Sequence, residues 1–162
     1  MFTIFVRLTL SLFLTISLFA CQNNNSQHTQ DKINSQSSIL SASNDSLYHH
    51  VVFIHDEVMP LNSNILALQQ KLKKQVGQLD TENNAELLNI LSQLQKAYDG
   101  MMTWMHEFKN LELHADDYQK WSESETEKYL KAEESKIKDV AQIMRQSLAA
   151  ATAFSKKIES LK

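Results

Sequence analysis

The sequence predicts an all-α fold: an antiparallel up-down-up three-helix bundle with coiled-coil-like heptad patterns, preceded by a signal peptide and a disordered tether. Three observations predict it. From Ser46 onward the chain contains one proline, Pro60, and two glycines, Gly77 and Gly100, so helix breakers are scarce. Apolar residues recur at alternating spacings of three and four. The helices that this pattern indicates are similar in length and closely connected, which favours antiparallel neighbours.

The first residues are typical of a secretory signal. An apolar run follows the single early charge, Arg7, and ends in the sequence LFAC at residues 18–21. The run is too short for a comfortable membrane span but suits the core of a signal peptide. LFAC resembles the bacterial lipobox, in which a small residue precedes the cysteine that receives the lipid. The resemblance implies a signal peptide over residues 1–20 and a lipid on Cys21.

Cys21 is the only cysteine, so an intramolecular disulfide is impossible. Gln22 follows it, and no acidic cluster comes after. By similarity to known sorting signals, this implies a lipid-anchored protein of the cell envelope, held at the outer membrane and facing the periplasm. The alternative is an ordinary secretory signal whose cysteine is incidental.

Residues 21–44 are rich in asparagine, serine and glutamine and contain few large apolar residues. They offer too little apolar surface to offset the loss of chain entropy, so we expect a disordered tether. The remaining residues, 45–162, form one predicted helical domain, large enough for one core.

The first helix is expected at about residues 46–78. Its apolar stripe consists of Leu47, Val51, Ile54, Val58, Leu61, Ile65, Leu68 and Leu72. Pro60 removes the amide that would bond to the carbonyl of Asp56. Because the stripe stays in phase across Pro60, we expect a kink there and a continuous helix.

The other two helices are expected at about residues 83–113 and 124–161. The second stripe consists of Leu87, Leu91, Leu94, Tyr98, Met101, Met105 and Phe108, and the third of Leu130, Glu133, Ile137, Val140, Met144, Ser147, Ala151, Phe154, Ile158 and Leu161. Thr81 or Asn83 is the expected cap of the second helix, after a turn around Gly77. Ser124 with Glu127 fits a capping box at the start of the third.

The octapeptide MMTWMHEF, residues 101–108, gathers potential soft-metal ligands on the second helix. At 100° per residue Trp104 and His106 lie on opposite flanks of the stripe, so they cannot close on one ion. Met102, Met105 and His106 can approach one another.

Antiparallel pairing brings further candidates to the same level. It places His55 opposite His106 and Met59 opposite Met102, and a second turn brings Glu133 level with Trp104, to within about one helical turn. The candidate metal layer therefore consists of His55, Met59, Met102, Met105, His106 and Glu133.

Thioether and imidazole ligands together suit copper, especially Cu(I), and two imidazoles with a carboxylate suit zinc; of the two metals, the layer favours copper over zinc. A second interpretation of the same residues is purely structural. Methionine commonly fills irregular gaps in a core, and a glutamate within an apolar stripe can simply pair with a lysine or histidine.

Other site classes find no support. No phosphate-binding loop, nucleophile elbow or HExxH motif occurs, and no catalytic residue is assigned. The formal net charge of -3 and the lack of a basic stripe argue against nucleic acid. The charged run from Asp116 to Lys136 is interpreted as a loop and a solvated helix face, with Tyr118 and Trp121 packing over the end of the bundle.

The blocks HDEVMP, residues 55–60, and MMTWMHEF resemble small helical lipoproteins of the Bacteroidota, which sometimes carry the automatic label of a viral A-type inclusion protein. The resemblance implies a helical fold and an envelope address, and it carries no catalytic residues over.

Two functions follow as expectations. The first is a non-enzymatic, lipid-anchored helical protein with a structural or protein-interaction role, binding a partner or another copy of itself through helical surfaces. The alternative is a periplasmic copper-binding lipoprotein that uses the His/Met layer.

Overall fold

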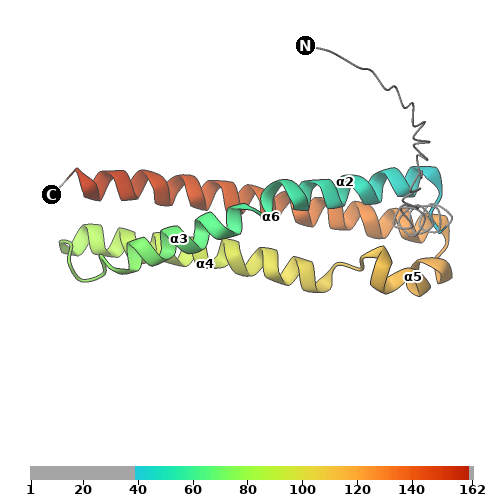
Figure 1. The fold of residues 1–162 in the computed structure, drawn as a ribbon, viewed down its shortest axis with the longest axis horizontal. Coiled ribbons are helices and arrows are strands. Elements are labelled where there is room, and N and C mark those ends of the chain that lie inside the picture. The colour runs from blue at the N-terminus through green and yellow to red at the C-terminus, as the bar shows by residue number, and fades with distance from the viewer. Residues whose placement is uncertain (1–38, 161–162) are drawn as a thin grey trace, which may run out of the picture.

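The computed structural model describes residues 39–160, which form an elongated helical rod (Figure 1). The all-helical class is confirmed: within this range the structure contains helices and turns and no strand. The helices are α2 (Ala42–Val58), α3 (Leu61–Lys73), α4 (Thr81–Glu107), α5 (Leu111–Lys120) and α6 (Glu123–Glu159). The predicted signal peptide, the lipobox with Cys21 and most of the predicted tether lie outside the described residues.

The helices lie side by side along the long axis of the rod. α6 spans its whole length, and α2 and α3 follow one another beside it. α4 runs back along α3 and ends beside α2, and α5 follows it toward the same end of the rod (Figure 1). Contacts join α6 to α2, α3 and α4, and α3 to α4. No helix of the described range is both long and apolar enough to cross a membrane.

The helical domain begins earlier than predicted. Residues 41–44 were expected in the tether, but Ser41 caps α2 by accepting a hydrogen bond from the amide of Asn44. Asn44 is buried, and its side-chain amide donates to the carbonyl of Glu123 at 3.0 Å. This contact crosses between distant segments, which a composition argument cannot detect.

The first predicted helix is divided in two. α2 ends at Val58 and α3 begins at Leu61, so the expected continuous kinked helix is wrong at Pro60. Pro60 has no amide hydrogen, and the backbone of Met59 and Pro60 stays near helical values while the ladder of hydrogen bonds is interrupted. α3 then ends at Lys73 and not near residue 78, and Gly77 adopts a φ of 75° in the turn that follows.

The second predicted helix is also shorter than expected. α4 is capped by Asp80, whose carboxylate accepts from the amide of Asn83 at 2.9 Å, so the predicted caps Thr81 and Asn83 are wrong. α4 stops at Glu107 because Phe108 is extended, and α5 follows as a separate helix. The predicted loop after residue 113 is therefore largely helical.

The third predicted helix is confirmed as α6, with its capping box two residues earlier than expected. Ser122 caps the helix, and Glu125 bonds back to the amide of Ser122 at 2.7 Å. The pair of Ser124 and Glu127 is not the cap. Both pairs have the same spacing, so the sequence motif alone does not choose between them.

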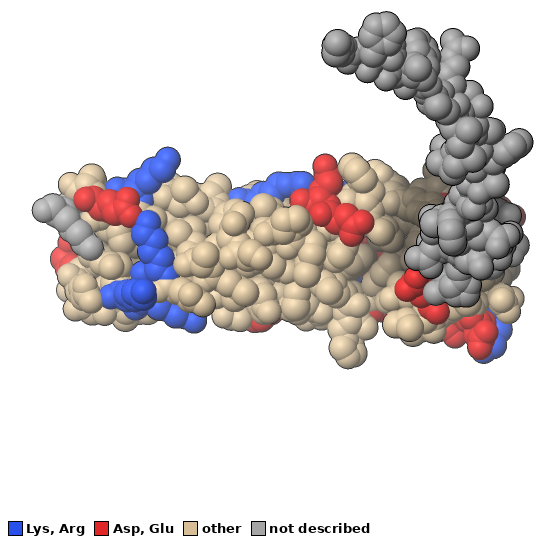
Figure 2. All heavy atoms as spheres, in the orientation of Figure 1, with Lys and Arg blue, Asp and Glu red and all other residues tan. Residues whose placement is uncertain are grey.

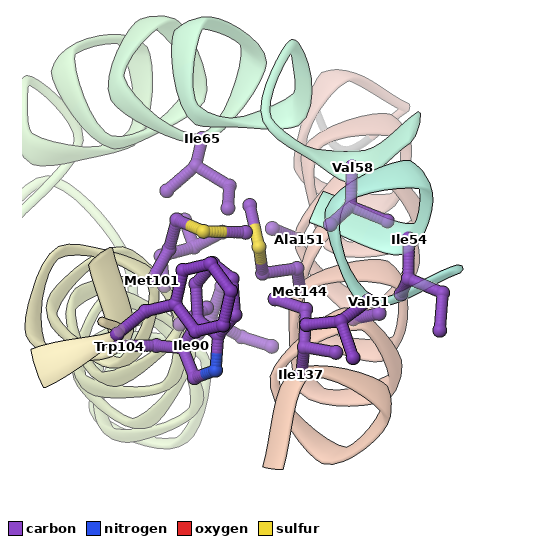
Figure 3. Close-up of a cluster of buried hydrophobic side chains, with 14 of the residues drawn as sticks. Val51, Ile54, Val58, Ile65, Ile90, Met101, Trp104, Ile137, Met144 and Ala151 are labelled. Carbon is purple, nitrogen blue, oxygen red and sulfur yellow. The ribbon is translucent and has the colours of Figure 1, made fainter. Parts of the chain in front are cut away.

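The core follows the predicted stripes in α6 but a different phase in α4. The buried residues of α4 are Leu87, Ile90, Leu94, Ala97, Met101 and Trp104, and Phe108, directly after the helix, is buried as well. Trp104, expected on a flank, is 5% exposed, whereas Met105, expected in the stripe, is 40% exposed. Figure 3 shows Ile65, Met101 and Met144 pointing toward one another from α3, α4 and α6. Met101 is therefore a core residue that fills space between helices.

Candidate functional site

A stack of four rings joins α2 to the end of α4. Tyr48 lies 5.8 Å from Phe108, Phe108 lies 4.7 Å from Trp104, and Trp104 lies 5.4 Å from His55, measured between ring centroids. All three pairs are stacked with interplanar angles of 28° or less. The stack forms because residues seven apart on α2 and four apart on α4 share one helix face. Stacked aromatic pairs contribute about 0.5–1.5 kcal/mol each beyond their buried area.

Three tyrosine hydroxyls hold the chain where α4 ends. Tyr129 accepts from the amide of Lys109 at 2.7 Å, Tyr118 donates to the carbonyl of Lys109 at 2.7 Å, and Tyr48 accepts from the amide of Leu111 at 3.1 Å. These bonds replace helical ones, which explains why α4 stops without a proline or glycine. Burial raises the pKa values of Tyr48, Tyr118 and Tyr129, and that of Tyr129 reaches about 12.

Beside the ring stack lies a groove of about 300 Å³, which we call the aromatic groove. Its volume is at the lower end of the range typical of ligand sites. It runs between α2 and the junction of α4 with α5. It is lined by Tyr48, Val52, His55, Asp56, Trp104, Met105, Phe108, Asn110 and Glu112.

Two polar atoms of the ring stack lack a hydrogen-bond partner. The Nε1 atom of Trp104 and the Nε2 atom of His55 are buried without one. The other ring nitrogen of His55, Nδ1, lies 2.9 Å from a carboxylate oxygen of Asp56. A carboxylate in this position fixes the orientation of the imidazole ring.

Two residues of the predicted metal layer, His55 and Met105, line the aromatic groove. The stacking of His55 on Trp104 agrees with the predicted level of α2 against α4 to within a helical turn. Met105 is the more accessible of the two, whereas most of the His55 ring is covered.

The other four residues of the predicted layer have separate surroundings. Met59 accepts a hydrogen bond from the side chain of Asn62, Met102 is half-buried against the core, and His106 is exposed. Glu133 is buried and pairs with Lys136 at 2.8 Å. No group of three or more His, Cys, Asp or Glu side chains that could hold a metal ion occurs within residues 39–160.

The level of Glu133 along α6 agrees with the prediction to within about one helical turn. A methyl carbon of Val140 lies 4.0 Å from where a side chain on Gly100 would begin, so these two residues are level. Glu133 therefore lies about one helical turn beyond Trp104.

Sequence reasoning missed most of the groove. Tyr48, Val52, Asp56, Asn110 and Glu112 line it but were not singled out. A usable signal was present for Tyr48, because an aromatic residue seven positions before His55 lies on the same helix face. Asn110 and Glu112 had no such signal, since their position depends on the break after α4.

Comparisons with known proteins do not assign this chain to a family: no family model matches it, and neither a curated protein nor a solved structure is detectably similar.

Proposed function

We propose that this chain is a non-enzymatic, lipid-anchored protein of the bacterial cell envelope that binds a partner protein through the aromatic groove. The groove is the observation that carries the proposal. It combines aromatic walls, an accessible methionine and a few polar groups, which is the composition typical of protein-recognition surfaces.

The proposed working form is an up-down-up bundle of three segments: α2 with α3, α4 with α5, and α6. In this form the rod is a rigid support, and the break after α4 opens the surface on which the groove lies. Cys21, at the outer membrane and facing the periplasm, is the proposed attachment point, which rests on the LFAC sequence.

The proposed address is tested by substituting Cys21→Ser in the full chain and separating membrane from soluble periplasmic fractions. We expect the wild-type chain in the outer-membrane fraction with a mass increased by acyl chains, and the variant without that mass and released from the membrane. Equal partition of both chains would contradict the lipid anchor.

The proposed binding role is tested by placing a photo-crosslinking residue at Val52, in the groove, and at Gln70, an exposed control position on α3. We expect a discrete crosslinked species in cells from position 52 only. It should disappear when Glu112→Lys is added, because a reversed charge changes the groove without touching the core. Equal labelling from both positions would argue against a specific site.

A second candidate function, copper binding, is favoured by one observation. His55 is oriented by Asp56 and shares the groove with the thioether of Met105. Titration of the full chain with Cu(I) against a competing chelator tests it. Under this proposal His55→Ala weakens binding by about tenfold or more. His106→Ala, which changes an exposed side chain that does not line the groove, has no effect. Failure of the wild-type chain to compete would eliminate this candidate.

A further inference from the structure

The aromatic groove carries negative charge that the chain itself does not neutralise. Asp56 and Glu112 line it, and no lysine or arginine does. Within residues 39–160 neither carboxylate pairs with a lysine or arginine; Asp56 contacts only the ring of His55. Glu112 lies in the first turn of α5, where a negative charge is favourable, but its side chain is left exposed.

The two helices on either side extend this imbalance. Between Ala42 and Gln70, a stretch that includes all of α2, there is no lysine or arginine. Between Ala97 and Phe108, the last turns of α4, there is none either. The segments of α2 and α4 that border the groove therefore carry no lysine or arginine, and the electrostatic potential of the groove favours a positively charged occupant.

The groove also offers apolar surface next to these carboxylates. Val52 and the ring stack form its wall, and Met105, with its flexible thioether, can adapt to the shape of a bound group. Lysine and arginine have the matching character, because their aliphatic stems pack on apolar surface while their charged ends reach a carboxylate.

From these observations we infer that the aromatic groove binds a cationic, amphipathic segment of a partner protein. A lysine or arginine of that segment meets Asp56 and Glu112, and a neighbouring apolar side chain packs on Val52 and Met105. The inference rests on the proposed function and adds the chemistry of the partner.

A second groove on the rod has the opposite character. It lies between the start of α3 and the second half of α6 and is lined by Leu61, Arg145, Leu148, Ala149, Thr152, Ala153 and Lys156. Two basic side chains and no carboxylate line it, so it should reject the same segment. The selectivity we infer therefore belongs to the aromatic groove and not to the apolar surface of the rod as a whole.

The test uses two short fluorescent peptides with the same leucine pattern, one carrying lysines and the other glutamates at the polar positions. Binding to the full chain, held in uncharged detergent micelles at low salt, is measured by fluorescence anisotropy. The double variant Asp56→Asn/Glu112→Gln removes the groove charges. Asp139→Asn/Glu107→Gln removes two charges from a third groove, which lies between α4 and α6, and is the matched control. The micelles are the same in every sample, so differences between variants report on the protein.

We expect the lysine peptide to bind and the glutamate peptide not to. The groove variant should weaken binding about fivefold or more, as two exposed charge pairs would. The control variant should bind like the wild-type chain, and binding should fall as salt increases. Equal binding of both peptides, or equal loss in both double variants, would overturn the inference. A specific crosslink from position 52 with no preference for the lysine peptide would overturn the cationic partner alone, while absence of the crosslink would count against the proposed function.

Discussion

Trp104 is the residue on which the ring stack depends, because its indole stacks on both His55 and Phe108. Replacing it with alanine leaves a cavity between α2 and α4. We expect Trp104→Ala to lower the free energy of unfolding by about 3–5 kcal/mol. Met105→Ala, one position away but 40% exposed, should cost about 1 kcal/mol or less. Chemical denaturation of both variants measures the difference.

If Met105→Ala lowered the free energy of unfolding more than Trp104→Ala, the heptad phase predicted from the sequence would be the correct one. Both phases of α4 share Leu87, Leu94, Met101 and Phe108, so the pattern contains no information that separates them. Packing decides it: the large indole is buried against α2, and the flexible methionine is left at the edge. The predicted metal layer depends on which residues of α4 face the core, so it is subject to the same ambiguity. Of its members, only His55 and Met105 line the groove.

The buried tyrosines predict a loss of stability in strong base. Burial raises the pKa of Tyr129 to about 12, against the opposing effect of the bond from the Lys109 amide. The folded-state pKa of Tyr129 exceeds its unfolded value of about 10. The contribution of the buried, neutral Tyr129 hydroxyl to stability is therefore complete below pH ~10 and is lost as the pH rises through about 12. Tyrosinate absorbance and helical circular dichroism, followed together, should change in that window.

Tyr129→Phe is the control for this titration, since it removes the late ionisation at that position. Ionisation of every tyrosine near pH ~10 with no accompanying loss of helix would contradict the burial argument.

At the scale of single helices, the start of α6 offers a clean comparison. Ser122 accepts from the amide of Glu125 and caps the helix, whereas Ser124 is an exposed residue of its first turn. Ser122→Ala should cost about 1 kcal/mol of unfolding free energy, and Ser124→Ala should be close to neutral. Thermal unfolding of the two variants measures this, and an equal cost would mean that the cap is not where the structure places it.

The existence of long helices was predictable, but two of their ends were not. The break at Pro60 has a local cause that the sequence shows, although its severity depends on how α3 packs against α4. The end of α4 has no local cause. It depends on hydroxyl groups of Tyr48, Tyr118 and Tyr129, which are far from one another in the sequence. The apolar periodicity of a helix reports only on that helix, so it cannot predict a break that depends on side chains of three other helices.

At the scale of the whole molecule, α3 has the most polar buried face of the packed helices. Its buried face includes Asn62 and Gln69; the side-chain oxygen of Asn62 has no partner, and Gln69 donates to Gln95 at 3.3 Å. We expect amides of α3 to exchange with solvent at least about tenfold faster than those in the middle of α6, because local opening there sacrifices less apolar burial. Hydrogen-exchange mass spectrometry measures this.

The matched variant is Asn62→Leu/Gln69→Leu, which replaces buried polar groups with apolar ones. It should bring the amide exchange rates of α3 closer to those in the middle of α6. Uniform protection along the rod in the wild-type chain would show that the polar face does not weaken α3.

Charge is also distributed unevenly along the rod. Residues 39–60 and 101–138, at the α5 end, contain twelve acidic residues and six lysines. Residues 61–100 and 139–160, at the other end, contain six acidic residues and seven lysines or arginines. On the face shown in Figure 2, blue atoms gather toward the end that carries the C-terminus. This charge distribution would steer a cationic partner of the kind inferred above toward the end that carries the aromatic groove.

The tyrosine-held junction after α4 also has a consequence for how the chain reaches this structure. Its bonds join residues 63 apart, in the case of Tyr48 with Leu111, and 20 apart, in the case of Lys109 with Tyr129. Tyr118 is on α5 itself, but the hydroxyls of Tyr48 and Tyr129 lie on α2 and α6, so α4 and α5 cannot complete the junction until those longer loops have closed. The aromatic groove therefore forms only after α2 has docked against the junction of α4 with α5, so a chain that has not finished folding lacks it.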